Sequence, residues 1–278
     1  MTDYSWVQLG QMVLILMAAG VAAGLVAGLF GIGGGFVVVP TLLVVFGFFG
    51  VDDEILMKTA VATSLATIVV TGFRSAYAHY KKGAVDMQII KDWAPWIIIG
   101  AIIGTLLTRV LDASALKLIF SVGVFLMGLH FVFPSKNNVR FRFSAEMPRG
   151  PIMASIATVL GGFCAMLGIG GGTPAVMVMT ACGRQIHQSV ATAAGFGVLI
   201  AVPGTLGNMV VGWGEEGLLA GSVGYVNLIA AAAIVSMSVF TAPIGARLAH
   251  SLDAVKLKRF FGIYLLFTSA WVFYKAIA

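Results

Sequence analysis

The chain has 278 residues, of which 59% are hydrophobic and 10% are charged, with a formal net charge of +6 and a mean hydropathy of +1.00. A soluble domain carries about 25% charged residues, so this composition excludes a water-soluble globular protein. We attribute the basic excess to the cytoplasmic loops of a membrane protein rather than to nucleic-acid binding. The N-terminal residues lack a basic stretch and a small-residue cleavage site, so no cleaved signal peptide is expected.

Ten hydrophobic segments follow one another along the chain. In the first half they cover about residues 7–30, 36–49, 55–80, 93–109 and 115–133. In the second half they cover about residues 151–169, 173–182, 187–212, 220–249 and 255–277. A helix needs about 20 apolar residues to cross a bilayer, and most of these segments are close to that length. We predict an all-α polytopic membrane protein with an N-terminal domain at 1–133, a polar linker at 134–149 and a C-terminal domain at 150–278.

The two halves share three short motifs in the same order. The pairs are Gly31–Gly35 with Gly168–Gly172, Val61–Thr63 with Val190–Thr192, and Leu111–Ala113 with Leu252–Ala254. Such self-similarity indicates an internal repeat. Because each copy holds an odd number of segments, we expect the second copy to enter the membrane upside down, as in the inverted-topology repeats of many transporters.

The charged loops predict the orientation of these repeats. Lys and Arg accumulate in the cytoplasmic loops of membrane proteins. An arrangement with both termini outside and the linker 134–149 in the cytoplasm leaves only four of the 17 Lys and Arg residues outside, namely Lys58, Arg109, Lys117 and Lys275. We therefore predict a multi-pass protein of the cell membrane with this orientation.

The duplicated Gly-Ile-Gly-Gly-Gly sequence, the GIGGG motif, is expected to interrupt a helix in each half. Glycine costs about 1 kcal/mol relative to alanine inside a helix. The segments that follow would reach only about 21 Å and 15 Å at 1.5 Å per residue, whereas the hydrocarbon core is about 30 Å thick. Two interpretations fit, of which we favour the first: a re-entrant hairpin with GIGGG near its tip, or a full span followed by a short tilted one.

The two breaks are also the best candidates for a substrate site. Glycine lets backbone N–H groups approach a ligand, and the N-terminus of a helix attracts anions. The candidate residues are Gly33, Gly34, Gly35, Gly170, Gly171 and Gly172. Pro40 and Pro174 follow the breaks and are expected to shape the starts of the helices. The alternative is that these glycines only permit close helix packing.

At these residues the sequence resembles the TauE/SafE family of sulfite and organosulfur exporters. The resemblance covers essentially the whole chain and rests on the two GIGGG motifs, the nearby Pro40 and Pro174, and the segments 60–63 and 189–192. It implies transport of a small anion such as sulfite, thiosulfate, sulfoacetate or a related sulfonate. The motifs are specific for the family but not for the substrate, and many members have no assigned substrate.

Five polar residues within the hydrophobic segments are further candidates for substrate binding: Thr63, Ser64, Thr192, Arg74 and Asn208. Hydroxyl groups can hydrogen-bond an anion, but Ser and Thr in helices also bond the carbonyl four residues earlier. A guanidinium matches an oxyanion well, whereas the alternative for Arg74 is that its side chain extends to the membrane surface. Asn208 can bind substrate or join two helices by a hydrogen bond.

These observations lead to one functional prediction with two alternatives. We predict a secondary transporter, not an enzyme, that exports a small anion by alternating access around the two GIGGG motifs. No catalytic residue, metal site or cofactor is expected, and the sequence has no P-loop. The expected partners are the anion, the lipid bilayer and, as an open question, a coupling ion such as a proton or sodium; the oligomeric state is also open. The alternatives are an anion channel of the same fold and a membrane enzyme.

Overall fold

The computed structural model describes residues 6–30, 34–133, 147–248 and 254–277. The first half contains α1 (Trp6–Phe30), α2 (Gly35–Phe48), α3 (Asp53–Lys81), α4 (Met87–Val110) and α5 (Ala113–Val132). The second half contains α6 (Gly150–Leu167), α7 (Gly172–Ala181), α8 (Ile186–Val211), α9 (Leu228–Leu248) and α10 (Ala254–Ile277). Two short strands, β1 (Ser222–Val223) and β2 (Val226–Asn227), precede α9.

The helices confirm an all-α polytopic membrane protein. Eight of the helices in the described part of the chain are long and apolar enough to cross a bilayer, whereas α2 and α7 are shorter. The expected ninth segment began at residue 220, but α9 starts at Leu228. The preceding residues instead form the antiparallel β1–β2 pair. Outside the spans, Tyr225 donates a hydrogen bond to Glu215 at 3.0 Å, and burial together with this bond raises the pKa of Tyr225 to about 12.

Short polar side chains define where several helices begin. The carboxylate of Asp86 accepts a hydrogen bond from the N–H of Ile89 at 3.2 Å at the start of α4. Asp112 does the same for Ala115 at 2.7 Å at the start of α5. Such N-cap residues satisfy backbone donors that have no partner within the helix. Side chains therefore fix the starts of α4 and α5, whereas the two starts that follow the GIGGG motifs have no side-chain cap.

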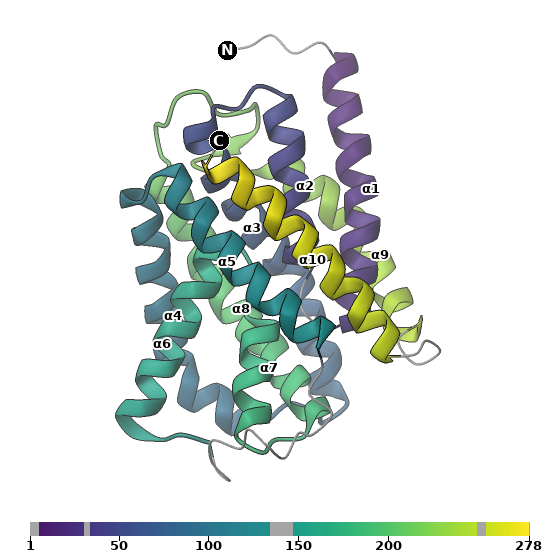
Figure 1. Cartoon of the computed structure of the whole chain (residues 1–278), viewed down its shortest axis with the longest axis vertical. Coiled ribbons are helices and arrows are strands. Elements are labelled where there is room, and N and C mark those ends of the chain that lie inside the picture. The colour runs from purple at the N-terminus through teal and green to yellow at the C-terminus, as the bar shows by residue number, and fades with distance from the viewer. Residues whose placement is uncertain (1–5, 31–33, 134–146, 249–253, 278) are drawn as a thin grey trace.

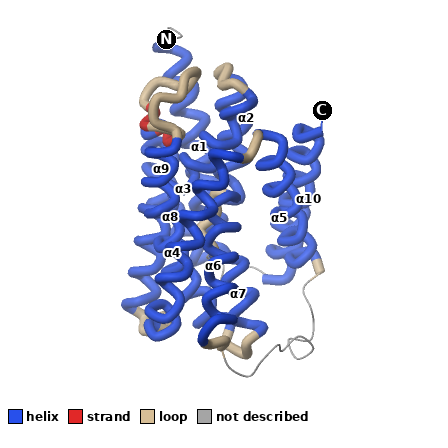
Figure 2. The backbone as a smooth tube through the Cα atoms, turned by 90° about the vertical axis from the view of Figure 1, so that its left-hand side faces the viewer, coloured by secondary structure: helices blue, strands red, loops and turns tan. Residues whose placement is uncertain are grey.

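The short helices α2 and α7 lie toward opposite ends of the molecule (Figure 1). The start of α1 and the end of α10 lie at the end occupied by α2, and α7 lies at the other end (Figure 2). Each short helix therefore runs back toward the end from which the preceding long helix came. The pairs α1–α2 and α6–α7 are helical hairpins that open in opposite directions.

An ion pair joins the helix ends on the α2 side of the molecule. Lys117, at the start of α5, pairs with Asp53 at the start of α3. The ammonium of Lys117 also lies 3.4 Å from the carbonyl oxygen of Lys275, near the end of α10. At the opposite end, Arg184 lies 3.6 Å from Asp86 and links the loop after α7 to the loop before α4.

The helices pack mainly across the two halves: α1 against α9, α4 against α6, α3 against α8, and α5 against α10. Glycine permits the closest of these contacts. A Cβ built at Gly104 on α4 would lie 2.3 Å from the carbonyl oxygen of Gly162, and one at Gly245 on α9 would lie 2.3 Å from that of Leu25. Two equivalent pairs of helices thus come together through small residues, as small-xxx-small packing in membranes predicts.

Alanine at either of these glycines is expected to destabilise the protein. In Gly104→Ala and Gly245→Ala the new methyl group would overlap backbone atoms, and such overpacking costs about 1–3 kcal/mol. Thermal unfolding in detergent should show a lower Tm for both variants. Gly10→Ala is the matched control, because nothing lies within 4 Å of a Cβ built at Gly10 on α1. If all three variants unfold at the same temperature, the helices do not approach as closely as described.

Candidate functional site

The two helix breaks meet in the interior of the protein. A Cβ built at Gly35 would lie only 2.6 Å from the carbonyl oxygen of Gly168. That same carbonyl accepts a hydrogen bond from the hydroxyl of Ser64 at 2.7 Å. Gly170 lies beside Ile68 and Gly197, the first on α3 and the second on α8. The structure therefore brings Gly34, Gly35, Ser64 and the second GIGGG motif together, whereas Gly33 lies outside the described residues.

Glycine is required for the backbone geometry at both breaks. Gly34 has a φ of 75° and is the N-cap of α2, and Gly171 has a φ of 69° and is the N-cap of α7. L-residues with a side chain rarely adopt this left-handed conformation. A glycine cap offers no side chain to the first N–H groups of the helix. The N–H of Val37 turns back to the carbonyl of Gly34 at 2.9 Å, so the N–H groups before it are the ones that could meet a ligand. The helices start at Gly35 and Gly172, close to the meeting point of the breaks.

The two prolines take different positions in the short helices. Pro174 lies in the first turn of α7, where a missing N–H costs little. Pro40 lies further along α2, so it cannot donate to the carbonyl oxygen of Phe36. The hydroxyl of Tyr264 lies 3.5 Å from that oxygen and supplies a donor from α10. Pro174 thus lies at the start of α7. Pro40 instead leaves the carbonyl of Phe36 free to contact Tyr264 in the other half.

Thr63 and Thr192 each hold the start of a helix in the other half. The hydroxyl of Thr63 accepts a hydrogen bond from the N–H of Asn227 at 3.0 Å, just before α9. The hydroxyl of Thr192 accepts one from the N–H of Asp86 at 3.0 Å, just before α4. Asn227 and Asp86 in turn cap those helices. The hydroxyls of these threonines are therefore occupied by equivalent contacts between the halves.

The remaining two candidates lie apart from the breaks. The side chain of Arg74 is exposed on the surface of α3. Asn208 is buried on α8, where its amide nitrogen donates to the carbonyl of Gly204 at 2.8 Å. Its side-chain oxygen, and the hydroxyl of Thr205 nearby on the same helix, are buried and have no hydrogen-bond partner among the described residues. Arg74 is therefore exposed at the surface of α3, whereas Asn208 is bonded within α8.

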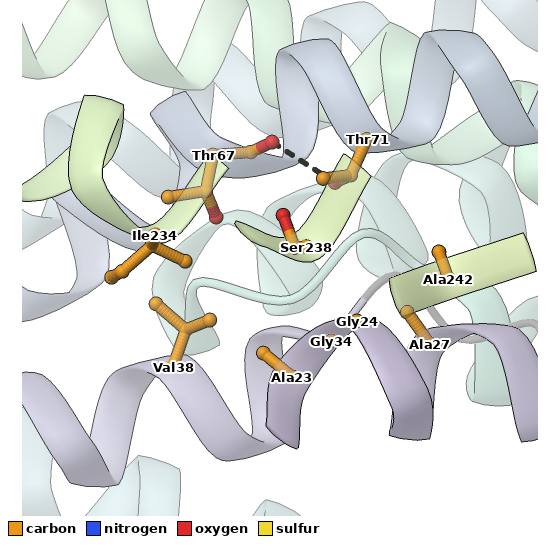
Figure 3. A pocket seen from close by; sticks show the side chains of 10 residues that line it. All are labelled: Ala23, Gly24, Ala27, Gly34, Val38, Thr67, Thr71, Ile234, Ser238 and Ala242. Atoms are coloured by element: carbon orange, nitrogen blue, oxygen red, sulfur yellow. Dashed lines mark hydrogen bonds between the residues drawn. The ribbon is translucent and has the colours of Figure 1, made fainter. Parts of the chain in front are cut away.

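A small pocket adjoins the first break, with walls from α1, α2, α3 and α9 (Figure 3). It has room for about one water molecule. Its lining residues are Ala23, Gly24, Ala27, Gly34, Val38, Thr67, Thr71, Ile234, Ser238 and Ala242. The polar side chains among them, Thr67, Thr71 and Ser238, were not singled out in the sequence, because a lone hydroxyl in an apolar helix carries no distinctive pattern.

Removal of the hydroxyl from Thr63 or Thr192 is expected to lower stability rather than substrate affinity. Thr63→Val leaves the buried N–H of Asn227 without an acceptor, and Thr192→Val does the same for the partly buried N–H of Asp86. The loss of such an acceptor costs about 1–3 kcal/mol. The variants should show a lower Tm in detergent, and Thr63→Ser and Thr192→Ser, which keep the hydroxyl, should stay close to the parent protein. A normal Tm combined with weaker transport of substrate would instead assign these hydroxyls to substrate binding.

Comparison with known proteins agrees with this architecture. The chain matches the sulfite exporter TauE/SafE family over residues 16–272. A "probable membrane transporter protein" of Haemophilus influenzae is 34% identical over 263 residues, which cover 95% of this chain and 98% of the relative. Relatives with the same description occur in Methanocaldococcus jannaschii, at 24% identity over 88% of this chain and 89% of the relative, and in Bacillus subtilis, at 24% identity over 95% and 98%. No solved structure matches the chain. This multi-pass protein therefore belongs to the sulfite exporter TauE/SafE family and is a membrane transporter, not an enzyme.

Proposed function

We propose that this transporter exports a small anion, sulfite or a related organosulfur anion, by alternating access around the meeting point of the two GIGGG motifs. The observation that carries the proposal is the contact between Gly35 and Gly168, which brings the starts of two short helices to one buried place. The N-terminus of a helix carries a partial positive charge and free N–H donors. Two such ends, approaching from opposite sides of the molecule, favour an anion over a cation or a neutral solute.

The packing between the halves supports an inverted repeat with domains 1–133 and 150–278. A Cβ at Gly24 on α1 would lie 2.7 Å from the carbonyl oxygen of Ser238 on α9, and one at Gly161 on α6 would lie 2.3 Å from that of Ile97 on α4. When the halves are aligned on their shared motifs, Gly24 corresponds to Gly161, and Ser238 corresponds to Ile97. The contact of Gly24 with Ser238 is therefore repeated as the contact of Gly161 with Ile97, with the roles of the two halves exchanged. A pseudo-two-fold axis between the halves requires such a repetition. Such repeats rocking against one another provide alternating access.

The distribution of charge supports an orientation with both termini outside the cell. The end of the molecule that carries the start of α3 and the start of α5 has acidic residues at 52–54 and at Asp112. The opposite end has basic residues at the end of α3, early in α4 and after α7, namely Lys81, Lys82, Lys91 and Arg184. Basic residues favour the cytoplasmic side, so the linker 134–149 is assigned to the cytoplasm.

Export of an anion in this orientation can proceed without ATP. The membrane potential, negative inside, favours outward movement of an anion by about 2.3 kcal/mol per charge for each 100 mV. A coupling ion, either a proton or sodium, would add to or oppose this driving force. An anion channel of the same fold would use the same gradient but would have no saturable cycle, and this difference separates the two functions.

Flux into proteoliposomes tests the function directly. Purified protein should carry radiolabelled sulfite, or another member of a panel with thiosulfate, sulfoacetate and chloride, with saturable kinetics and acceleration by unlabelled substrate on the other side. An inside-negative potential should stimulate efflux. A conductance too fast for a transport cycle would favour the channel, whereas absence of flux for every anion, in protein that remains folded, contradicts the proposal.

Alanine at the two helix-capping glycines of the breaks is expected to reduce the transport rate strongly. In Gly34→Ala and Gly171→Ala the new side chain strains the left-handed backbone by roughly 1–2 kcal/mol and approaches neighbouring atoms. A Cβ at Gly34 would lie 3.0 Å from the carbonyl oxygen of Ala23, and one at Gly171 would lie 2.6 Å from Ile200. We expect at least a tenfold lower kcat (one order of magnitude corresponds to about 1.4 kcal/mol).

Gly50→Ala is the matched control for the same measurement. Gly50 has a φ of 76°, almost the same as Gly34, but nothing lies within 4 Å of its Cβ position. The Gly50→Ala substitution therefore introduces a similar backbone strain in a loop away from the breaks. Normal transport by Gly34→Ala and Gly171→Ala, or an equal loss in Gly50→Ala, would remove the breaks from the transport mechanism.

A further inference from the structure

The neighbours of the two breaks can be compared residue by residue. Aligned on their shared motifs, the halves pair Gly34 with Gly171, Thr67 with Phe196, Thr71 with Ile200, Ala23 with Leu160, and Ser238 with Ile97. The packing follows the same alignment, because the backbone of Ser238 contacts Gly24 and the backbone of Ile97 contacts Gly161. The two sets of residues therefore occupy equivalent places beside equivalent breaks.

The place beside the first break contains the small pocket described above, and hydroxyl groups lie next to it. Ala23, Gly24, Ala27 and Ala242 provide small walls. Thr67 and Ser238 are each 2% exposed, and their hydroxyl groups point into the space between α1, α3 and α9 (Figure 3). This is the pocket described above, with Gly34 and the start of α2 at one side.

The equivalent place beside the second break is filled with large apolar side chains. A Cβ built at Gly171 would lie 2.6 Å from the Cδ1 atom of Ile200 and 3.8 Å from the Cδ2 atom of Leu160. Trp93 and Phe196 stack with ring centroids 6.0 Å apart. The exposed fraction of each of these side chains is 5% or less. Among Leu160, Trp93, Phe196 and Ile200, only Trp93 carries a hydrogen-bond donor, its indole N–H. An anion placed between these side chains would therefore lose most of its water without replacement, which is strongly unfavourable.

We propose that the transporter binds its anion on one side only, in the pocket beside Gly34, with the hydroxyls of Thr67 and Ser238 as donors. The side chains of Trp93, Phe196 and Ile200 close the equivalent position beside Gly171. This inference rests on the proposed function and assigns the substrate to one of the two breaks. The transporter thus has a duplicated fold but a single, asymmetric binding site.

The hydroxyl groups are able to change partner when the anion binds. Thr67 now donates to the carbonyl oxygen of Ser64 at 2.7 Å, and Ser238 donates to that of Val235 at 3.3 Å. Both acceptors belong to the same helix as the donor, so rotation of the side chain redirects the hydroxyl without breaking a contact between helices. Because the pocket now holds about one water molecule, binding also requires α1 and α9 to separate from α3.

Kinetics of variants at equivalent positions test this assignment, with radiolabelled sulfite in proteoliposomes as the probe. Thr67→Val keeps the size of the side chain and removes the hydroxyl, and Ser238→Ala does the same with little change in volume. Each is expected to raise KM by about tenfold or more, since a hydrogen bond to a charged group is lost. Thr67→Ser, which restores a hydroxyl, should return KM toward that of the parent protein.

The matched controls lie at the second break. Phe196→Leu and Ile200→Val shorten apolar side chains at the positions equivalent to Thr67 and Thr71, and we expect both to leave KM within twofold in protein of comparable Tm. Unchanged KM in Thr67→Val and Ser238→Ala would overturn the assignment, as would equal increases at both breaks. Failure of the parent protein to carry sulfite or any other anion of the panel would instead refute the proposed function itself.

Discussion

A membrane offers no water to an interrupted helix, so every backbone polar group at a break must find a partner within the protein. Here one partner comes from the opposite half of the chain, and others come from the helix that follows the first break. The carbonyl of Gly168 accepts a hydrogen bond from Ser64, and the carbonyl of Gly34 accepts hydrogen bonds from the N–H groups of Val37 and Val38 at the start of α2. Each break is tolerated because it is buried against the other half. The pairing of the halves, the hairpins and the meeting point of the two breaks all depend on this constraint.

The same constraint explains why small residues lie at the contacts between the helices. Two interrupted helices satisfy one another only when their backbones approach closely, and Gly35 approaches the carbonyl of Gly168 within a distance that no side chain permits. The helices that support the breaks approach equally closely, at Gly104 against Gly162 and at Gly245 against Leu25. Since lipid supplies no hydrophobic driving force for association, close packing and a few hydrogen bonds between the halves must hold the breaks together.

Sequence patterns predicted the helices well but the contacts between them poorly. Long apolar runs fix the helices because crossing a membrane requires a minimum length, and four glycines in five residues mark a break without any alignment. The β1–β2 pair escaped prediction because each strand has only two residues, too few for an alternating pattern to appear. The partners of Thr63 and Thr192 lie more than a hundred residues away in the chain, and no local pattern identifies such a contact. For these threonines, the repeated Val-Ala-Thr motif indicated importance but not the role.

Thr67 and Ser238 differ in chemical type from the residues at the equivalent positions of the second half. A repeat is usually searched for identities, yet a binding site in a duplicated fold is also marked by differences between equivalent positions. Where one half has Thr67 and Ser238 and the other has Phe196 and Ile97, packing demands are the same but the chemistry differs. Equivalent packing in the two halves explains the shared glycines, since α1 and α9 must meet at the same distance as α4 and α6. It does not explain why Thr67 and Ser238 carry hydroxyls where the second half has the apolar side chains of Phe196 and Ile97. That difference follows if both halves support the fold and only one of them contacts the anion.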